Sequence, residues 1–367
     1  MPLPPLVDPL DMLDADEAAR TARHAILAGF GDVAQRRLAA AHVAVIGAGG
    51  IGSPVVLALA AAGVGELTII DDDDVEVSNL QRQIMHRRSD VGHPKVDSAR
   101  RVAQDLSQSV VHTVRERVTA ANASAMLAGA HVVIDGTDTF ETREVVAAAC
   151  ESLGTPLVWG VVQEFHAQAT VFWSSPPPGT PAVLLRDLYP PESVGTVPSC
   201  SEVGVLGSLC MQVGALLATE AIKLITGTGE PLLGRVVIID ALRGRSDEVP
   251  LRPSTAAANR HTPPLPLVAQ LTPVEALTAQ QAGATIIDVR EPSETSAGII
   301  AGATRIPLQQ LLQNPSLAGT GAVVIVCKGG MRAERAAHAL IAAGHSASVL
   351  EGGMDAWSVA QREVVPA

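Results

Sequence analysis

The sequence predicts an α/β fold with two domains, a doubly wound parallel sheet followed by a smaller α/β domain. Short apolar strands alternate with Ala- and Leu-rich helical stretches, which is typical of a parallel sheet covered on both faces. The stretch 247–268 is rich in Pro, Ser, Thr and Asn and has no sustained period, so it predicts a linker. Strand–helix alternation restarts after it, and a length of 367 residues suits about two domains.

The first domain is predicted at 21–246, after an arm at 1–20 that we expect to be loosely ordered. Its elements in chain order are a mostly helical segment at 21–41, the strand HVAVIG, a glycine-rich turn, a helix at 53–62, the strand ELTIID, and strand segments at 131–138 and 155–162. The second domain is predicted at 269–367, where ATIIDVR and AVVIVC are its first strands.

Composition excludes several classes of protein. A net charge of -12 argues against non-specific binding to nucleic acid, which needs a basic surface. No apolar run of membrane-spanning length is free of glycine or charge. The N-terminus carries acids where a signal peptide would be basic. We therefore expect a cytoplasmic protein that binds neither nucleic acid nor membranes.

The four cysteines are Cys150, Cys200, Cys210 and Cys327. No two of them have C-x-x-C spacing, so the sequence predicts neither a zinc site nor a disulfide framework. Cys150 and Cys210 lie in Ala- and Leu-rich helical patterns, which favours a packing role for both.

A nucleotide-binding turn is predicted at Gly47, Gly49 and Gly52, which form G-x-G-x-x-G between a strand and a helix. Glycines let the backbone turn tightly and approach a phosphate, and the helix N-terminus favours its charge. Asp71 closes the next strand and can accept hydrogen bonds from ribose hydroxyls. Taken alone, this pattern fits NAD as well as ATP.

The segments that follow favour ATP. Arg82 and Gln83 lie in VSNLQRQ, Lys95 lies in VGHPKVDSAR, and Asp138 lies in DGTDTFETR. A dehydrogenase has no need of Arg and Lys around a triphosphate, whereas adenylation builds charge on the α-phosphate and on pyrophosphate. A carboxylate such as Asp138 is suited to hold Mg²⁺ through its oxygens. ATP and Mg²⁺ are therefore the expected cofactors.

Residues 20–245 resemble the ThiF/HesA/MoeB-type adenylyltransferases, the bacterial relatives of ubiquitin-activating enzymes. The motifs that carry the resemblance are GAGGIGSPV, AAGVGELTIIDDDDVEVSNLQRQ, DGTDTFETR, VPSCSEVGVLG and GEPLLGRVVIIDAL. The resemblance implies a Rossmann-like fold and ATP-dependent adenylation of a ubiquitin-like sulfur-carrier protein that ends in Gly-Gly.

The same resemblance implies roles for further residues. Gly50 joins the nucleotide-binding turn, Asn79 shapes the phosphate pocket, and Arg23 reaches into the neighbouring protomer's site, which implies a homodimer. Asp73 either assists the nucleotide or belongs, with Asp74, to a solvated acidic turn.

Cys200, in VPSCSEVG, resembles the family's crossover-loop cysteine. That cysteine can attack an adenylated carboxylate or share a sulfur linkage with the carrier, and a purely structural role stays open. Many relatives hold a structural zinc with two C-x-x-C pairs. The segment LLRDLYP at 184–190 has no cysteine, so we expect no zinc.

Cys327 ends a strand and opens a six-residue loop with two central glycines. The loop comprises Cys327, Lys328, Gly329, Gly330, Met331 and Arg332. Its N–H groups can curl around the sulfur, and the two basic side chains should stabilise a thiolate that carries a persulfide. Together with DVREPSETSAGIIAGATRIPL and LEGGMDAW, the loop resembles a rhodanese domain. A persulfide or thiosulfate is the expected sulfur donor.

The leading hypothesis is adenylation of a carrier's C-terminal glycine, followed by sulfur transfer from Cys327 to give a thiocarboxylate for molybdopterin, thiamine or related biosynthesis. One alternative is an NAD-dependent oxidoreductase with a rhodanese appendage, which leaves the Arg82, Lys95 and Asp138 set unexplained. The other is a non-catalytic module that binds a carrier, supported only by the missing zinc cysteines.

Overall fold

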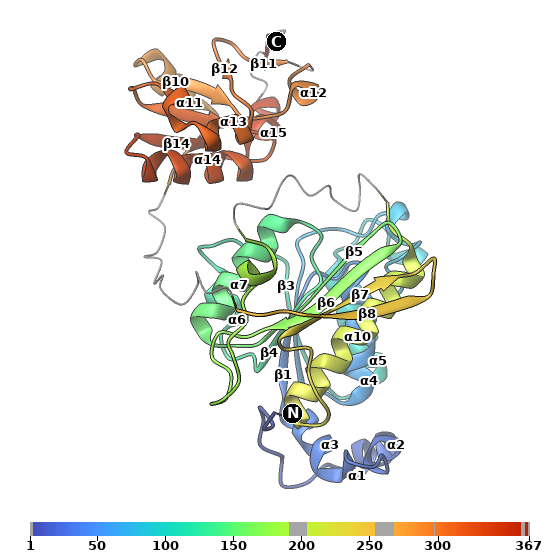
Figure 1. The fold of residues 1–367 in the computed structure, drawn as a ribbon. Coiled ribbons are helices and arrows are strands. Elements are labelled where there is room, and N and C mark those ends of the chain that lie inside the picture. The colour runs from blue at the N-terminus through green and yellow to red at the C-terminus, as the bar shows by residue number, and fades with distance from the viewer. Residues whose placement is uncertain (1–2, 191–203, 254–267, 297, 361–363, 366–367) are drawn as a thin grey trace. The chain divides into compact units, whose positions relative to one another are not determined.

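The computed structural model describes residues 3–190, 204–253, 268–296, 298–360 and 364–365 (Figure 1). The chain divides into two compact units, residues 1–259 and 260–367. Each unit has its own main sheet and its own hydrophobic core.

The first unit is built on an eight-stranded sheet. In spatial order its strands are β3 (Val110–Val114), β2 (Glu66–Ile70), β1 (His42–Ile46), β4 (Val132–Asp135), β5 (Leu157–Gln163), β6 (His166–Phe172), β7 (Arg235–Asp240) and β8 (Arg245–Pro250). The strands from β3 to β5 are parallel, and β6, β7 and β8 continue the sheet antiparallel.

The central strand β1 is buried on both faces because the sheet separates two cores. Val43 and Val45 point into one core and Ala44 and Ile46 into the other, as the two-residue period of a strand requires. Helices α3 (Gly31–Ala40), α4 (Gly52–Ala62), α5 (Lys95–Leu106) and α10 (Gly207–Thr226) pack into the first core. Helices α6 (Ala123–Leu127), α7 (Phe140–Leu153) and α8 (Leu185–Leu188) pack into the second.

The register of the parallel strands brings three chain segments together. Ile46 lies opposite Ile70 on one side and opposite Asp135 on the other. The turns that follow β1, β2 and β4 therefore leave the sheet at the same edge. Ligands of open α/β sheets bind outside the carboxyl ends of the strands, at such an edge.

Helix α10 is the central core helix of the first unit. Within its 20 residues, a stretch of 18 has a mean hydropathy of 1.4, which meets the length and composition of a membrane span, but 61% of that stretch is buried. It packs closely on α4, since a Cβ at Gly214 would lie 2.3 Å from Pro54 Cγ and 2.6 Å from Ile51 O. The apolar length of α10 therefore serves the core.

The N-terminal segment corrects the expectation of a loosely ordered arm at 1–20. The Leu6 N–H donates to Leu224 O on α10, and Val7 is buried. Residues Ala15–Arg20 form α1, with Asp14 accepting from the N–H of Glu17 as N-cap, and Ala22–Ala25 form α2. The apolar side chains between the prolines hold this segment against the core.

The start predicted for the linker, residue 247, is too early in the chain. Its first residues belong to β8, which pairs antiparallel with β7 from Arg235↔Pro250 to Asp240↔Arg245. All six residues of β8 are exposed, so backbone hydrogen bonds rather than an apolar pattern hold this edge strand.

The second unit has a five-stranded parallel sheet. In spatial order its strands are β12 (Thr304–Arg305), β10 (Thr285–Asp288), β13 (Val323–Val326), β14 (Ala347–Leu350) and β9 (Ala269–Leu271). Its helices are α11 (Pro273–Gln281), α12 (Pro292–Thr295), α13 (Leu308–Gln313), α14 (Met331–Ala342) and α15 (Gly353–Val359). Strands β11 (Ile299–Ile300) and β15 (Val364–Val365) form a separate antiparallel pair.

The close approach of α10 to α4 predicts that one glycine-to-alanine substitution in α10 lowers the stability of the fold, where such a substitution normally raises it. Glycine to alanine inside a helix normally stabilises by about 0.5–1 kcal/mol. We expect Gly214→Ala instead to lower the thermal midpoint, because overpacking costs roughly 1–3 kcal/mol. Calorimetry with Thr219→Ala, on the exposed side of α10, as the control checks this. A raised midpoint in Gly214→Ala would contradict the described packing.

Candidate functional site

A cavity of about 480 Å³ lies at the carboxyl edge of the first sheet. Ten of the residues predicted to bind nucleotide line it: Gly47, Gly49, Gly50, Asp71, Asp73, Asn79, Arg82, Gln83, Lys95 and Asp138. The predicted glycines, carboxylates and cations therefore converge on one space.

The glycine turn needs glycine for two reasons. Gly47 has φ +87°, and a Cβ there would lie 3.1 Å from Gly136 O. A Cβ at Gly52 would lie only 1.8 Å from Gly47 O, so Gly52 lets α4 approach the turn and does not line the cavity. Gly50 lies against Cys210, where a Cβ would be 3.1 Å from the sulfur. Cys210 is thus a core residue that also lines the cavity floor.

Asp71 and Lys95 form the charged centre of the cavity. The Asp71 carboxylate accepts hydrogen bonds from the N–H groups of Ala48 (2.7 Å) and Asp73 (2.9 Å). Lys95 Nζ lies 3.9 Å from Asp71 Oδ1 and 2.7 Å from Asp73 Oδ2. Burial raises the pKa of Asp71, and the Lys95 ammonium opposes this shift. Lys95 is buried at the first position of α5, so its charge needs these carboxylates.

The segment between β2 and α5 supplies an amide and a guanidinium. Arg82 is half-buried, and its Nη1 donates to Ser78 O at 3.2 Å. Gln83 is buried, and within the described residues its Oε1 has no hydrogen-bond partner. Asn79 is also buried, and its Oδ1 accepts from the N–H of Glu76, which fixes the short turn that shapes this wall.

Asp138 lines the cavity on the turn after β4, and its carboxylate is exposed. Asp135, which sequence reasoning missed, holds this turn by accepting from the Thr137 N–H (2.9 Å) and Oγ1 (2.7 Å). Arg143, also missed, donates to Thr137 O at 2.8 Å and lies 5.8 Å from the centre of the Trp159 ring. Burial raises the pKa of Asp135, and the Arg143 charge opposes this. Both residues lie in DGTDTFETR, but nothing local marks them as buried.

His86 is a third residue that sequence reasoning missed. It is buried, with Nε2 2.9 Å from Ala48 O and Nδ1 2.6 Å from Ser98 Oγ. A carbonyl oxygen only accepts, so Nε2 carries the proton of the neutral ring and Nδ1 is an acceptor. Nδ1 and Lys95 O, at 3.0 Å, then compete for the single proton of the Ser98 hydroxyl. Burial lowers the pKa of His86, and Lys95 lowers it further. The ring therefore ties the glycine turn to the first turn of α5.

Two predicted residues lie elsewhere. Arg23 is exposed on α2 and does not line the cavity, so its role in a neighbouring protomer stays a prediction. Ile26 and Leu27 beside it are 71% and 53% exposed, an apolar surface next to this arginine. Cys200 lies outside the described residues.

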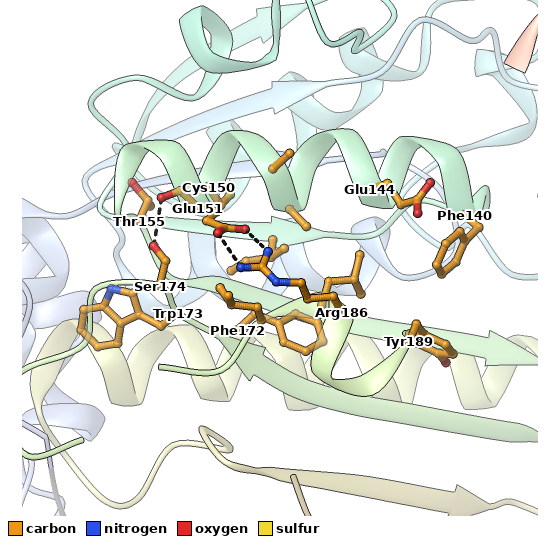
Figure 2. Close-up of a pocket in the computed structure, with 15 residues that line it drawn as sticks. Phe140, Glu144, Cys150, Glu151, Thr155, Phe172, Trp173, Ser174, Arg186 and Tyr189 are labelled. Atoms are coloured by element: carbon orange, nitrogen blue, oxygen red, sulfur yellow. Dashed lines mark hydrogen bonds and ion pairs between the residues drawn. The ribbon is translucent and has the colours of Figure 1, made fainter. Parts of the chain in front are cut away.

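A second cavity, of about 180 Å³, lies between α7, α8 and β6 (Figure 2). Arg186 spans it and donates to both carboxylate oxygens of Glu151, at 2.6 and 2.9 Å. Burial raises the pKa of Cys150 on its wall, which favours the packing role. In the LLRDLYP segment, Asp187 accepts from the Leu184 N–H at 2.8 Å, and the absence of zinc stays a prediction.

Cys327 follows β13 in the second unit. Its sulfur is buried and accepts a hydrogen bond from the Gly330 N–H at 3.1 Å. The loop is shorter than the sequence predicted, because α14 begins at Met331. Arg332 pairs with Glu294 through both terminal nitrogens, and its predicted effect on the Cys327 thiolate stays a prediction. This pair lowers the pKa of Glu294, and Lys328 is exposed.

Comparison with known proteins identifies both units. The sequence profile of the ThiF family matches residues 21–259. The chain belongs to the ThiF family. Within this ThiF family member, residues 272–360 match the rhodanese-like domain, so two families are joined in one chain.

Two of the relatives cover nearly the whole chain, and a third covers about two thirds of it. The probable adenylyltransferase/sulfurtransferase MoeZ of Mycobacterium tuberculosis is 41% identical over 384 residues, covering 97% of this chain and 96% of its own. The adenylyltransferase and sulfurtransferase MOCS3-1 of Zea mays is 35% identical and covers 96% and 83%. The SAMP-activating enzyme E1 of Haloferax volcanii is 44% identical and covers 65% and 87%.

Solved structures agree on the fold. MccB of E. coli with ATP has a TM-score of 0.52 at 22% identity, covering 60% of this chain and 68% of its own. PaaA has a TM-score of 0.53 at 23% identity, covering 66% and 76%. At these identities the likeness supports the fold of this ThiF family member alone.

The buried imidazole predicts acid-sensitive stability. An unfolded chain titrates His86 near 6.5, whereas the folded chain holds it neutral to lower pH. Below pH 6.5 the unfolded state therefore binds more protons at His86 than the folded state does. The contribution of neutral His86 to the free energy of unfolding is complete above pH 6.5 and is lost as the pH falls towards the pKa of the folded state. We expect His86→Gln to flatten the fall of the thermal midpoint between pH 7.5 and 5. Exposed His112→Gln is the control, and an unchanged slope in His86→Gln counts against the network.

Proposed function

We propose that this chain is an adenylyltransferase and sulfurtransferase that uses ATP to activate the C-terminal carboxylate of a ubiquitin-like sulfur-carrier protein ending in Gly-Gly. One observation carries the proposal: the glycine turn, Asp71, Arg82, Lys95 and Asp138 line a single cavity. The names of several relatives support it, among them the sulfur carrier protein adenylyltransferase of Thermus thermophilus, 41% identical over 239 residues.

Binding of ATP follows from the geometry of the cavity. The backbone around Gly47 and Gly49 can approach the phosphates because glycine has no side chain. Asp71 is held by two backbone N–H groups, and its remaining lone pairs can accept from ribose hydroxyls. Gln83 also lines this cavity.

The chemical step depends on positive charge beside the α-phosphate. A carboxylate oxygen of the carrier attacks the α-phosphorus, a new P–O bond forms, and the bond to pyrophosphate breaks. Lys95 and Arg82 offset the charge that builds on these oxygens, and a buried ammonium acts more strongly than one in water. The products are an acyl-adenylate and pyrophosphate.

The residues present also fit Mg²⁺. Asp138 presents an exposed carboxylate to the cavity, and hard oxygen ligands are those that Mg²⁺ prefers. Asp71, Asp72 and Asp73 also cluster, but Lys95 already pairs with two of them, so Asp138 is the better ligand. When bound, the ion supplies charge neutralisation of the phosphates. Asp135 and Arg143 keep the Asp138 turn in place for it.

Sulfur transfer belongs to the second unit. The Cys327 thiolate first attacks the outer sulfur of thiosulfate or of another persulfide, the S–S bond of the donor breaks, and sulfite or a thiolate leaves. The terminal sulfur then attacks the acyl carbon, AMP leaves with its electron pair, and an acyl disulfide forms. A second thiol attacks Cys327 Sγ, a disulfide forms with Cys327, and the thiocarboxylate leaves. An external thiol reductant then reduces this disulfide and restores Cys327. Cys200 is proposed to attack the acyl-adenylate or to share a sulfur linkage with the carrier. The pathway served is molybdopterin, thiamine or related sulfur biosynthesis.

A homodimer and a cytoplasmic location complete the proposal. Arg23 needs a partner protomer, because it lies outside the cavity of its own chain. The NAD-dependent alternative leaves Arg82, Lys95 and Asp138 unexplained, although all three line the cavity. The non-catalytic alternative leaves the same set and Cys327 without purpose.

The adenylation step can be tested at Lys95. We expect Lys95→Ala to lower carrier-dependent exchange of labelled pyrophosphate into ATP by at least roughly 100-fold, since one donor aimed at developing charge contributes this much. Arg100→Ala, on the exposed face of the same helix, is the matched control. Equal exchange in Lys95→Ala and wild type would remove Lys95 from the mechanism.

The sulfur step can be tested separately. Cys327→Ala should abolish transfer of sulfur from thiosulfate to cyanide, because no other atom replaces the nucleophile, while pyrophosphate exchange persists. Cys150→Ala removes a buried thiol elsewhere and should leave both reactions intact. Sulfur transfer that survives in Cys327→Ala would rule out this cysteine as the carrier.

A further inference from the structure

The loop after β13 is held from two sides. On one side, the Gly330 N–H donates to Cys327 Sγ at 3.1 Å. On the other side, the Cys327 carbonyl accepts from the Met354 N–H at 2.8 Å, and the Lys328 carbonyl accepts from the Asp355 N–H at 3.0 Å. The donors of the second side belong to the first turn of α15.

These two hydrogen bonds fix the direction of the following amides. In a trans peptide the C=O and the N–H point in opposite directions, and the described residues contain no cis peptide bond. Because the carbonyls of Cys327 and Lys328 point to α15, the N–H groups of Lys328 and Gly329 face the other way. N–H groups stabilise a thiolate or persulfide, whereas carbonyl oxygens repel it.

Gly353 is what allows α15 to come this close. It has φ +57°, and a Cβ there would lie 2.3 Å from Cys327 O and 2.4 Å from Lys328 O. Both neighbours are backbone atoms of the sulfur loop, so no rotamer change can relieve the contact. Any side chain at 353 must push the loop and α15 apart.

We propose that Gly353 and the first turn of α15 position the sulfur loop, by holding two carbonyl oxygens back so that the amides are available to the sulfur anion. This inference rests on the sulfurtransferase activity proposed for Cys327. Gly353 acts through the loop backbone and is therefore a positioning residue. This role accounts for the second glycine of the LEGGMDAW motif.

The test begins with Gly353→Ala in the full chain. We expect transfer of sulfur from thiosulfate to cyanide to fall by roughly 100-fold, as for a displacement of about 1 Å in a reacting group. We also expect the midpoint of the pH profile for alkylation of Cys327 by iodoacetamide, followed by mass spectrometry, to move to higher pH. Gly344→Ala is the matched control, with φ +89° and nothing within 4 Å of its Cβ. It should keep the wild-type rate and profile.

A second pair of variants acts on the hydrogen bond between the Asp355 N–H and the Lys328 carbonyl. The Asp355 N–H belongs to the first turn of α15, where helical N–H groups lack an intrahelical acceptor, so proline is tolerated there. Asp355→Pro deletes the donor to Lys328 O together with the carboxylate, and its Cδ takes the place of the amide hydrogen, so the Lys328 carbonyl must move away from α15. Asp355→Ala removes the carboxylate and keeps the N–H. We expect Asp355→Pro to shift the midpoint of the alkylation profile to higher pH. Asp355→Ala, which only removes a carboxylate near Gly329, should give no shift to higher pH.

The outcomes separate this inference from the proposed function. Wild-type rates and alkylation profiles in Gly353→Ala, or equal effects of Asp355→Pro and Asp355→Ala, would overturn the positioning role. A wild-type chain without sulfur transfer would instead overturn the proposed sulfurtransferase activity. The alkylation profile of Cys327 still tests the loop in that case, because it needs no sulfur donor.

Discussion

The nucleotide cavity depends on one constraint, the register of the parallel strands. Ile46 stands level with Ile70 and Asp135, so the turns after three strands open at the same height. The backbone contact between Gly52 and Gly47 O then brings α4 directly under the first of these turns. The segments that carry the cavity side chains start from these strand ends, and a slip of one residue in a strand would turn the side chains of that strand to the opposite face of the sheet.

Several buried charged groups gather around the cavity, and each requires compensation. Lys95 is paired with two carboxylates, and Asp135 is held by Thr137 and the nearby Arg143. An uncompensated charge in such surroundings would cost several kcal/mol. The neutral His86 fits the same scheme, because a further positive charge beside Lys95 would be repelled. The low local dielectric that makes this pairing necessary also strengthens the field that acts on a phosphate.

The sequence predicted what local motifs encode. Gly47 and Lys95 stand out because a glycine turn and a helix start have recognisable neighbours in the chain. His86 could not be found this way, since its role comes from carbonyl and hydroxyl partners on other elements. The partner of Arg332, Glu294, is likewise distant in sequence. The strand at 247–250 was missed because an exposed edge strand needs no apolar pattern.

The ion pair between Lys95 and Asp73 gives the cation a counter-ion of its own. The Asp73 side chain is 65% exposed, so in the proposed function its carboxylate can turn to solvent when a phosphate of ATP takes its place beside Lys95. Binding of ATP then replaces the Asp73 carboxylate with a phosphate as the counter-ion of Lys95. The affinity therefore reflects the difference in free energy between the Lys95–phosphate pair and the Lys95–Asp73 pair. When the products leave, Asp73 can pair with Lys95 again, so the buried ammonium is not left without a counter-ion.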